Sequence, residues 1–281
     1  MKSLEPLPKR SLRVGVVQMT SGEDISANIK DVSNALESLR VEKCDLICLP
    51  ENVFFLRIDK SSKTADAMNL KETFWQEFCN FANQEKCSIL FGSVALKRDK
   101  KKSTSATILV SPQKRPKVVY EKIHLFDVDV KGAPPVRESL FFEYGKKPKL
   151  IKINDWNIGL SICYDVRFAE LYQAYAAKNA HLILVPAAFL VPTGLAHWHV
   201  LLRARAIESQ AFVVAAAQAG NHTNSQGATR QTFGHSLVVG PWGEIKLDMG
   251  NSGAKVTAIT LDVAELQKTR EQIPMAHHRR L

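Results

Sequence analysis

The chain has 281 residues, of which 45% are hydrophobic and 23% charged, and its formal net charge is +10. This composition excludes a disordered or fibrous protein, and no apolar run approaches the ~20 residues that a membrane helix needs. The basic residues are spread over short runs such as 97–102 and 146–149 rather than gathered in a binding module, so we expect neither a nucleic-acid nor a membrane partner.

The amino-terminal residues are basic, but no cleavage pattern of small residues follows them. Five cysteines are an odd number without the density of a disulfide scaffold, and such usage suits a reducing compartment. We therefore expect a soluble, cytoplasmic protein.

In the first half of the chain, short β-branched runs alternate with helical patterns. A cap at Ser21 or Asp24 precedes the first helical pattern. The predicted elements are a strand at 13–19, a helix at 25–40, a buried strand at 45–50, a helix at 71–85, and strands at 88–96 and 106–112 flanking the charged run 97–102, which we interpret as a hairpin tip.

The second half repeats this alternation. The turn-rich "NDWN" predicts a hairpin that leads into Cys163. The predicted elements are hairpin strands at 149–153 and 158–162, helices at 169–180, 196–210 and 264–273, and strands at 182–186, 211–218, 236–247 (two strands around a turn) and 256–262. So many strands, often apolar on both faces, predict two sheets packed together with helices outside.

Three residues with reactive side chains stand where a buried run stops: Glu51 in "LPENVF", Lys122 in "YEKIHLFDV" and Cys163 in "SICYDVRF". Residues at strand ends can point into one cleft, which is where α/β proteins place their reactive groups. A lone cysteine after a strand can also be buried filler, and lone Glu or Lys residues are commonly surface or ion-paired groups, so these interpretations stay open on the residues alone.

Cys163 lies between a strand and a turn that enters a helix. We expect this position to expose the side chain and to let helix-terminal N–H groups favour the thiolate. Glu51 is a better base for the thiol than His124, because a carboxylate after Pro50 in a hydrophobic strand end can shuttle a proton. Lys122 supplies a positive charge that can stabilise an oxyanion.

Three further pairs are better explained by structure than by a second site. Cys44 and Cys48 have metal-ligand spacing, but no second Cys/His pair follows them. The second pair is Arg203 with Arg205, of which we expect one in a buried ion pair and the other facing a subunit partner. The third pair is His197 with His199, which have no acidic companion at ligand spacing and which we expect to pack at the site entrance.

The words "LPENVF", "YEKIHLFDVDV", "SICYDVRFAEL", "PAAFLVPTGLAHWHVLLRARAIESQAFVVAAAQAG" and "FGHSLVVGPWGE" resemble, in this order, those of the nitrilase, or carbon-nitrogen hydrolase, superfamily. The resemblance implies an α/β fold, a four-layer αββα sandwich of two mixed sheets with outer helices. It implies one domain over residues 1–281, with a core at about 12–261 and basic extensions, and a homodimer.

The same resemblance implies a catalytic triad of Glu51, Lys122 and Cys163. A further glutamate, Glu138 in "VRESLFF", is then expected to position the substrate and the lysine, and the backbone near Tyr164 to hold the oxyanion. Phe189 and Thr193, in the "PAAFLVPTG" loop, are candidates to line the pocket. No metal or organic cofactor is required.

Within the superfamily the chain looks most like the amidase branch, which includes ω-amidase and deaminated-glutathione amidase. We expect hydrolysis of a small carboxylated amide, either deaminated glutathione or an ω-amide of a keto acid, through a cysteine thioester. The alternatives are a nitrilase, a carbamoyl-amide hydrolase, or a catalytically silent binding protein on the same fold.

Overall fold

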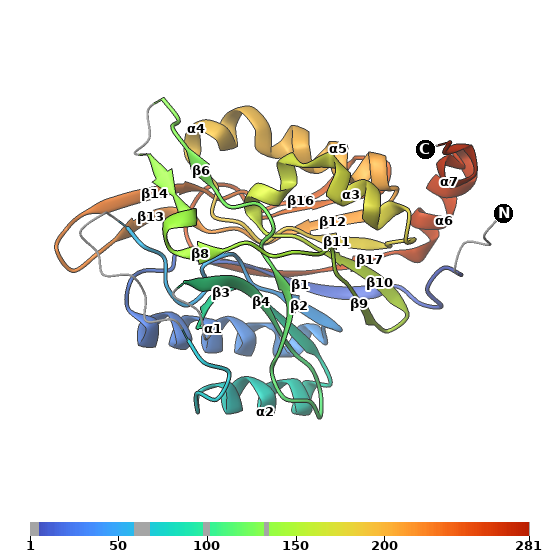
Figure 1. The fold of residues 1–281 in the computed structure, drawn as a ribbon. Coiled ribbons are helices and arrows are strands. Elements are labelled where there is room, and N and C mark those ends of the chain that lie inside the picture. The colour runs from blue at the N-terminus through green and yellow to red at the C-terminus, as the bar shows by residue number, and fades with distance from the viewer. Residues whose placement is uncertain (1–5, 59–67, 98–101, 132–134, 281) are drawn as a thin grey trace.

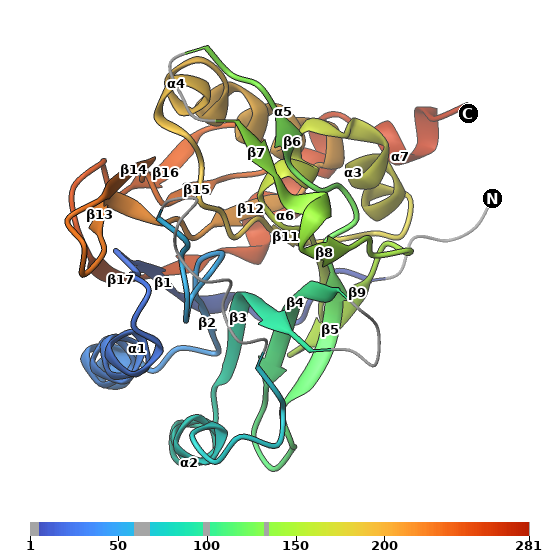
Figure 2. The ribbon, with the colours of Figure 1, turned by 60° about the vertical axis from the view of Figure 1, so that its left-hand side comes forward.

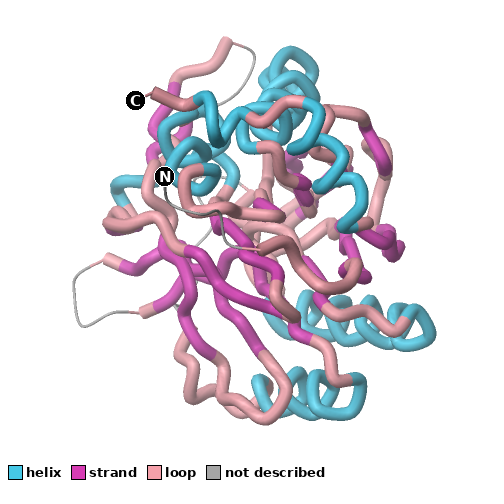
Figure 3. Tube along the Cα trace, turned by 90° about the vertical axis from the view of Figure 1, so that its right-hand side faces the viewer, coloured by secondary structure: helices cyan, strands magenta, loops and turns pink. Residues whose placement is uncertain are grey.

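The computed structural model describes residues 6–58, 68–97, 102–131 and 135–280. Two sheets pack face to face, and helices cover both outer faces, as Figures 1 and 3 show. This four-layer order confirms the αββα sandwich predicted from the sequence. Residues 98–101 of the predicted hairpin tip lie outside the described residues. Among the described helices, none is both long and apolar enough to span a bilayer.

The first sheet has seven strands in the order β17-β1-β2-β3-β4-β5, with β8 beside β4. Strands β1, β2 and β3 run parallel, β8 is parallel to β4, and the pairs β17–β1, β3–β4 and β4–β5 are antiparallel. The strands are β1 (Leu12–Gln18), β2 (Leu46–Cys48), β3 (Ser88–Leu96), β4 (Ser103–Val110), β5 (Lys117–Glu121), β8 (Phe142–Glu143) and β17 (Lys255–Leu261).

Helices α1 (Ile25–Leu39) and α2 (Trp75–Glu85) cover the outer face of this sheet (Figure 2). The alternation along β1 separates two cores, because successive strand side chains point to opposite faces. Val14 and Val16 pack in the core cluster that includes the second sheet, whereas Val17 packs with α1 and α2. Asp24, one of the two predicted cap residues, caps α1 by accepting a 3.0 Å hydrogen bond from the Ala27 N–H.

The second sheet has six strands in the order β16-β15-β12-β11-β10-β9 and is also mixed. Helices α3 (Ala169–Ala176) and α5 (His199–Ser209) cover its outer face. The strands are β9 (Leu150–Ile153), β10 (Trp156–Leu160), β11 (Leu182–Leu184), β12 (Phe212–Ala215), β15 (Leu237–Val239) and β16 (Ile245–Asp248).

The helix predicted at 196–210 differs in its first turns. A short helical turn, α4 (Val191–Thr193), leads into a π-helix, η4 (Gly194–Trp198), which continues into α5. Sequence analysis also missed two hairpins. The remaining elements are β6 (Asp127–Val128), β7 (Val136–Arg137), β13 (Ala219–Thr223), β14 (Thr229–Phe233), α6 (Val263–Gln272), α7 (Met275–His278), and the 3-10 helices η1 (Arg40–Glu42), η2 (Glu138–Leu140) and η3 (Cys163–Arg167).

Gly92, inside β3, lies where the segment after β2 and the segment after β11 approach closely. A Cβ at this position would lie 2.3 Å from the Leu49 carbonyl oxygen, 2.4 Å from the Pro50 carbonyl oxygen and 2.3 Å from the Pro186 Cβ. No real Cβ has such neighbours, and most of them are backbone atoms that cannot swing away. Glycine at position 92 therefore lets the chain before residue 51 lie directly against the end of β11.

Candidate active site

The three predicted reactive residues come from strand ends of both sheets. Glu51 follows β2 and Lys122 follows β5, both in the first sheet, while Cys163 begins η3 after β10 of the second sheet. All three side chains are buried. The candidate site therefore lies where the two sheets meet, at the strand ends.

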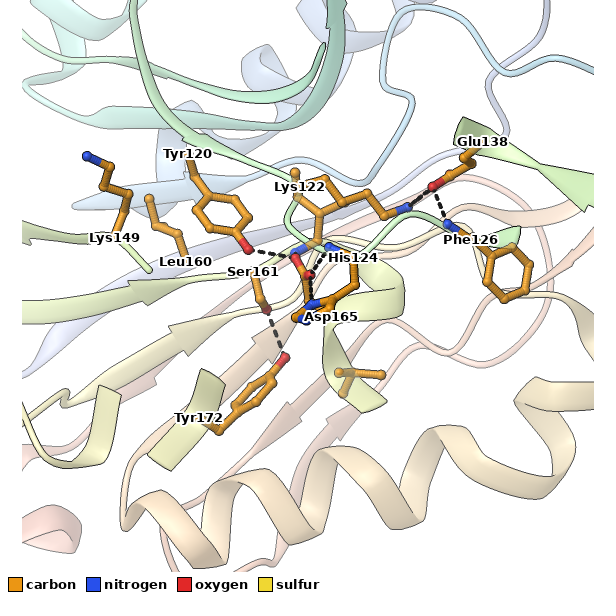
Figure 4. Close-up of polar contacts among 12 residues, drawn as sticks. Tyr120, Lys122, His124, Phe126, Glu138, Lys149, Leu160, Ser161, Asp165 and Tyr172 are labelled. Atoms are coloured by element: carbon orange, nitrogen blue, oxygen red, sulfur yellow. Dashed lines mark hydrogen bonds and ion pairs between the residues drawn. The ribbon is translucent and has the colours of Figure 1, made fainter. Parts of the chain in front are cut away.

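The Lys122 ammonium is held between two carboxylates. Its Nζ lies 2.7 Å from Glu51 Oε1 and 2.9 Å from the Glu138 carboxylate. Figure 4 shows the Lys122 side chain extended toward Glu138. The predicted neighbour of the lysine, Glu138, is thus in contact with it. One positive and two negative charges leave a net negative charge on this group when both carboxylates are ionised.

Each carboxylate is also fixed by a backbone donor. The Ala188 N–H donates to Glu51 Oε2 at 2.8 Å, and the Phe126 N–H donates to Glu138 Oε2 at 2.8 Å. Hydrogen bonds from N–H groups to a carboxylate are stronger than neutral ones and hold its orientation. Each acid therefore contacts both the lysine and a main-chain N–H, and Glu138 Oε2 contacts both at once, at 2.9 Å from Nζ and 2.8 Å from the Phe126 nitrogen.

The two carboxylates keep the lysine charged despite its burial. Burial alone would lower the pKa of Lys122, but the charges of Glu138 and Glu51 outweigh it and raise that pKa well above its ordinary value. Lys122 is therefore a fixed cation at every pH at which the protein is folded and the two acids are ionised. A fixed cation can stabilise developing negative charge but cannot serve as a base.

Cys163 has a φ of 47°, in the left-handed region that a non-glycine residue seldom adopts. Its N–H donates to the Pro186 carbonyl at 2.9 Å, which holds this turn against the end of β11. Strained backbone of this kind aims a nucleophile in other strand-to-helix turns. The turn matches the elbow expected from the sequence.

The environment of the thiol differs from the sequence-based expectation. Cys163 is only 6% exposed, and its pKa is raised well above the ordinary thiol value. Burial is the main cause and the charge of Glu51 the next, and the opposing effects of Lys122 and the Ala188 N–H are smaller. The helix-terminal N–H groups that were expected to favour the thiolate are outweighed, so the resting thiol is protonated and needs a base.

Asp165 anchors the turn that carries Cys163, and sequence analysis did not identify it. Its buried carboxylate accepts hydrogen bonds from the Tyr120 hydroxyl at 2.8 Å, from the His124 N–H at 3.0 Å and from the Ile162 N–H at 2.9 Å, as Figure 4 shows in part. His124 also places its Nδ1 2.7 Å from this carboxylate. The histidine considered as an alternative base is therefore paired with Asp165 and links Lys122's segment to the cysteine's.

Gln218 anchors the main chain at Glu51 through buried hydrogen bonds, as Asp165 anchors the turn at Cys163. Its Nε2 donates to the Glu51 carbonyl at 2.9 Å and to the Ser21 hydroxyl at 2.8 Å, while its Oε1 accepts from the Ser21 N–H at 3.0 Å. The side chain is fully buried. In the sequence, Gln218 stands at the end of an apolar run, which marks it as a polar residue next to the interior. No local pattern showed which segment it would contact.

Two of the candidate substrate-positioning residues, Tyr164 and Phe189, lie beside residues of the site. Tyr164 follows Cys163 and makes edge contacts with Phe126 and Phe168. Phe189 is buried one residue after Ala188, and the Arg167 guanidinium lies over its ring at 5.4 Å. Both residues are thus adjacent in sequence to groups of the site.

Thr193 is not brought to the site by any contact in the described structure. Its hydroxyl donates to the Leu190 carbonyl at 3.2 Å, within its own turn. This contact is typical of a residue that closes a helical turn.

The pairs interpreted as structural behave largely as expected. Arg205 is buried and forms an ion pair with Glu208 at 2.9 Å, whereas Arg203 is exposed. Cys44 and Cys48 are buried free thiols. His197 packs against Arg167 with a 3.1 Å contact.

His199 departs from the expectation. The sequence shows no acidic companion at ligand spacing, but the fold brings Asp248 to 2.9 Å from its Nε2. The two residues are 49 positions apart, and no local pattern could have paired them.

The arrangement combines a buried thiol, a carboxylate able to accept its proton and a fixed cation. Such a set can attack an electrophilic carbon, stabilise the resulting oxyanion and return a proton to a leaving group. This is the chemistry of acyl transfer.

Comparison with known proteins agrees with this geometry. Residues 13–271 match the family described as carbon-nitrogen hydrolase. The chain is 33% identical over 276 residues to the deaminated glutathione amidase of Yersinia enterocolitica, covering 96% of this chain and 94% of that protein. It is 34% identical over 272 residues to the Caenorhabditis elegans nitrilase and fragile histidine triad fusion protein NitFhit, covering 95% of this chain and 60% of the fusion protein.

Solved structures give the same result. The C. elegans NitFhit structure superposes with a TM-score of 0.86 at 32% identity, covering 98% of this chain and 66% of that one. Saccharomyces cerevisiae Nit3, a member of branch 10 of the nitrilase superfamily, has a TM-score of 0.83 at 29% identity, covering 99% of this chain and all of that one. The chain thus spans only about two thirds of the fusion protein but the whole of Nit3.

The electrostatics of the thiol predict an unusual effect of Glu51→Gln. The substitution removes the charge and the hydrogen bond that raise the pKa of Cys163 and leaves Lys122, which lowers it. We expect the pH midpoint for alkylation of Cys163 by iodoacetamide to fall by about one unit or more. Mass spectrometry of labelled protein across a pH series measures this midpoint.

Glu72→Gln, at an exposed position, is the matched control and should leave the midpoint unchanged. A midpoint that stays the same or rises in folded Glu51→Gln protein would show that Glu51 does not act on the thiol.

Proposed function

The chain belongs to the carbon-nitrogen hydrolase family and is an amidase of that superfamily, and on this premise we propose that it hydrolyses a small carboxylated amide to the acid and ammonia. Deaminated glutathione is the first candidate substrate, and an ω-amide of a keto acid is the second. The observation that carries the proposal is the Lys122 ammonium between Glu51 and Glu138, next to a thiol that needs a base. We further propose that residues 12–261 form the core of one domain.

The proposed mechanism begins with proton transfer. Glu51 takes the proton of Cys163 as the sulfur attacks the amide carbonyl carbon, and the new oxyanion is held by Lys122 and the backbone N–H near Tyr164. Glu51 then gives its proton to the departing nitrogen, the carbon–nitrogen bond breaks, and a thioester remains on the cysteine. Water attacks the thioester while Glu51 accepts its proton, and the acid leaves as the thiol is restored.

The raised pKa of Cys163 fits this sequence, since the thiol loses its proton only as it attacks. The raised pKa of Lys122 fits its role as a fixed charge. Glu138 contacts the lysine, and we assign it the positioning of Lys122 and of the amide nitrogen.

Two arginines support an anionic substrate. Arg230, in β14, donates to the Arg57 carbonyl at 2.7 Å and has no carboxylate partner among the described residues. Burial lowers the pKa of Arg230, and the charges of Glu51, Cys163 and Glu138 oppose that effect. The guanidinium therefore lies close enough to interact electrostatically with the site. Such a guanidinium can pair with a carboxylate that the substrate brings.

The second arginine is Arg167, four residues after the cysteine. Its guanidinium lies over the rings of Tyr164 and Phe189, at 5.8 and 5.4 Å from their centroids, and it too has no acidic partner in the described part of the chain. These aromatic contacts fix the cation next to the two residues that we propose to contact the substrate.

We also propose that the protein forms a homodimer through the outer face of α5. Exposed apolar side chains gather there and on the adjoining turn between β15 and β16, where a Cβ at Gly243 would touch Ile207. They are Leu195, Val200, Ile207, Trp242 and Ile245, each at least 45% exposed. Apolar patches of this kind mark subunit interfaces.

The function predicts ammonia release that depends on Cys163. We expect purified protein to release ammonia from deaminated glutathione or α-ketoglutaramate, and Cys163→Ala protein to lose at least about 10³-fold in rate while remaining folded. A coupled ammonia assay on these substrates, a neutral short amide and a short nitrile measures this. Activity on the nitrile alone would replace the amidase proposal by a nitrilase. No activity on any substrate, with Cys163 unlabelled by iodoacetamide, would leave a silent binding protein.

The charge argument predicts a selective effect of Arg230→Met. For the carboxylated substrate KM should rise at least about tenfold, the value of one charged hydrogen bond, while kcat changes little. The rate on a neutral amide should not change. Arg279→Met, at an exposed terminal arginine, is the matched control. An equal loss on both substrates would show that Arg230 supports the fold and does not recognise the carboxylate.

The dimer predicts a mass that depends on Val200. Light scattering should give twice the chain mass for the wild type and a monomer for Val200→Asp, because an aspartate cannot be buried unpaired in an apolar interface. Val41→Asp, at a valine on η1 that is 81% exposed against 67% for Val200, should stay dimeric. A wild-type monomer, or a Val200→Asp dimer of unchanged stability, contradicts the proposed interface.

A further inference from the structure

Three potential metal ligands, none of which belongs to the proposed triad, converge at the edge of the second sheet. His199 is the first residue of α5, His235 lies between β14 and β15, and Asp248 ends β16. One ligand atom from each lies within 4.8 Å of the other two. It is the one group of this kind found among the described residues.

The aspartate lies between the two imidazoles. His199 Nε2 is 2.9 Å from Asp248 Oδ2, and His235 Nδ1 is 2.9 Å from Asp248 Oδ1 and 3.1 Å from Oδ2. Two imidazole nitrogens with one carboxylate are a ligand set typical of divalent transition metals in proteins.

The ligands are held in place by their surroundings. The His235 N–H donates to the Gly250 carbonyl at 2.7 Å, and its carbonyl accepts from Trp198 Nε1 at 2.8 Å. The His235 ring stacks on Phe233 at 4.5 Å, and the His199 ring meets the same phenylalanine edge-on at 6.0 Å. A site whose ligands are already positioned needs little rearrangement to accept an ion.

Asp248 has no lysine or arginine partner among the described residues, since neither residue type forms an ion pair with its carboxylate there. The two histidines and the Gly250 N–H, which donates to Oδ1 at 2.9 Å, hold the carboxylate in position. A divalent ion would bring a fixed positive charge to this carboxylate.

The site is open to solvent on one side. The side chains of His199, His235 and Asp248 are 31%, 23% and 31% exposed. These fractions leave room for an ion to enter and for water to complete its coordination.

We propose that His199, His235 and Asp248 bind a divalent transition-metal ion, of which Zn²⁺ is the best match. Zinc–nitrogen and zinc–oxygen bonds are about 2 Å long, so small rotations of the two rings bring all three ligand atoms onto one ion. The ion would join α5, the loop after β14 and the end of β16. Its role is to stiffen this edge of the sheet, and it takes no part in the amide chemistry, so the proposal stands or fails separately from the proposed function.

The test uses tag-free full-length protein carrying Cys163→Ser, stripped with a chelator, so that the reactive thiol cannot bind the metal. Zn²⁺ titration by calorimetry gives affinity and stoichiometry, thermal unfolding gives stabilisation, and the visible spectrum with Co²⁺ separates nitrogen and oxygen ligands from thiolates. His235→Gln and Asp248→Asn are the ligand variants. His197→Gln, at the neighbouring exposed histidine, is the matched control.

We expect one tightly bound Zn²⁺ per chain, a higher Tm with the ion present, and a Co²⁺ spectrum without thiolate charge-transfer bands. Both ligand variants should weaken binding at least about tenfold, and the control should not. If one variant fails to fold, as judged by circular dichroism, the other decides. Equal affinity in wild type and a folded ligand variant, or no binding at millimolar Zn²⁺, would leave a hydrogen-bonded His-Asp-His group and overturn the proposal.

Discussion

The arrangement around Lys122 is the constraint on which the rest of the site depends. Moving an ammonium and two carboxylates out of water costs several kcal/mol per ion, and only close pairing offsets that cost. Glu51 and Glu138 supply the pairing, and a main-chain N–H donates to one oxygen of each carboxylate. Loss of Lys122 would leave two carboxylates in the interior without their cation, so the lysine holds the group together. Burial and the charge of Glu51 keep the neighbouring thiol protonated in the resting site.

The fold meets this constraint by joining two sheets with a few buried polar anchors. Asp165 ties the segment after β5 to the turn of Cys163, and Gln218 ties the segment after β2 to the opposite sheet. These anchors make several hydrogen bonds each and lie in the interior, where a polar group without partners would be costly. Apolar contacts between the two sheets tolerate small shifts. The directional hydrogen bonds of these anchors remove that freedom and fix the distances between the reactive atoms.

Much of this could be predicted from the sequence, because it depends on local patterns. Period-2 alternation and buried apolar runs predicted the layers. The ends of those runs made Glu51 and Cys163 candidates for one cleft, and the resemblance to the carbon-nitrogen hydrolases implied that they act together. The anchoring roles of Asp165 and Gln218 could not be predicted, because their partners depend on which distant segments meet in the fold. The same holds for the group at Asp248, whose histidine partners lie far along the chain. The thiol is less exposed and its pKa higher than expected, because burial and a nearby carboxylate, both products of the assembled fold, outweigh the groups that favour the thiolate.

Gly92 shows how little freedom the interior leaves. The carbonyls that crowd it belong to the chain leading into Glu51, and the proline on its other side holds the Cys163 N–H and precedes the Ala188 N–H that binds Glu51. Any side chain at position 92 would act as a wedge between the acid and the nucleophile. The strand that backs the site can therefore carry no side chain at this position, so the side chains that shape a pocket for substrate must come from other segments around the reacting groups.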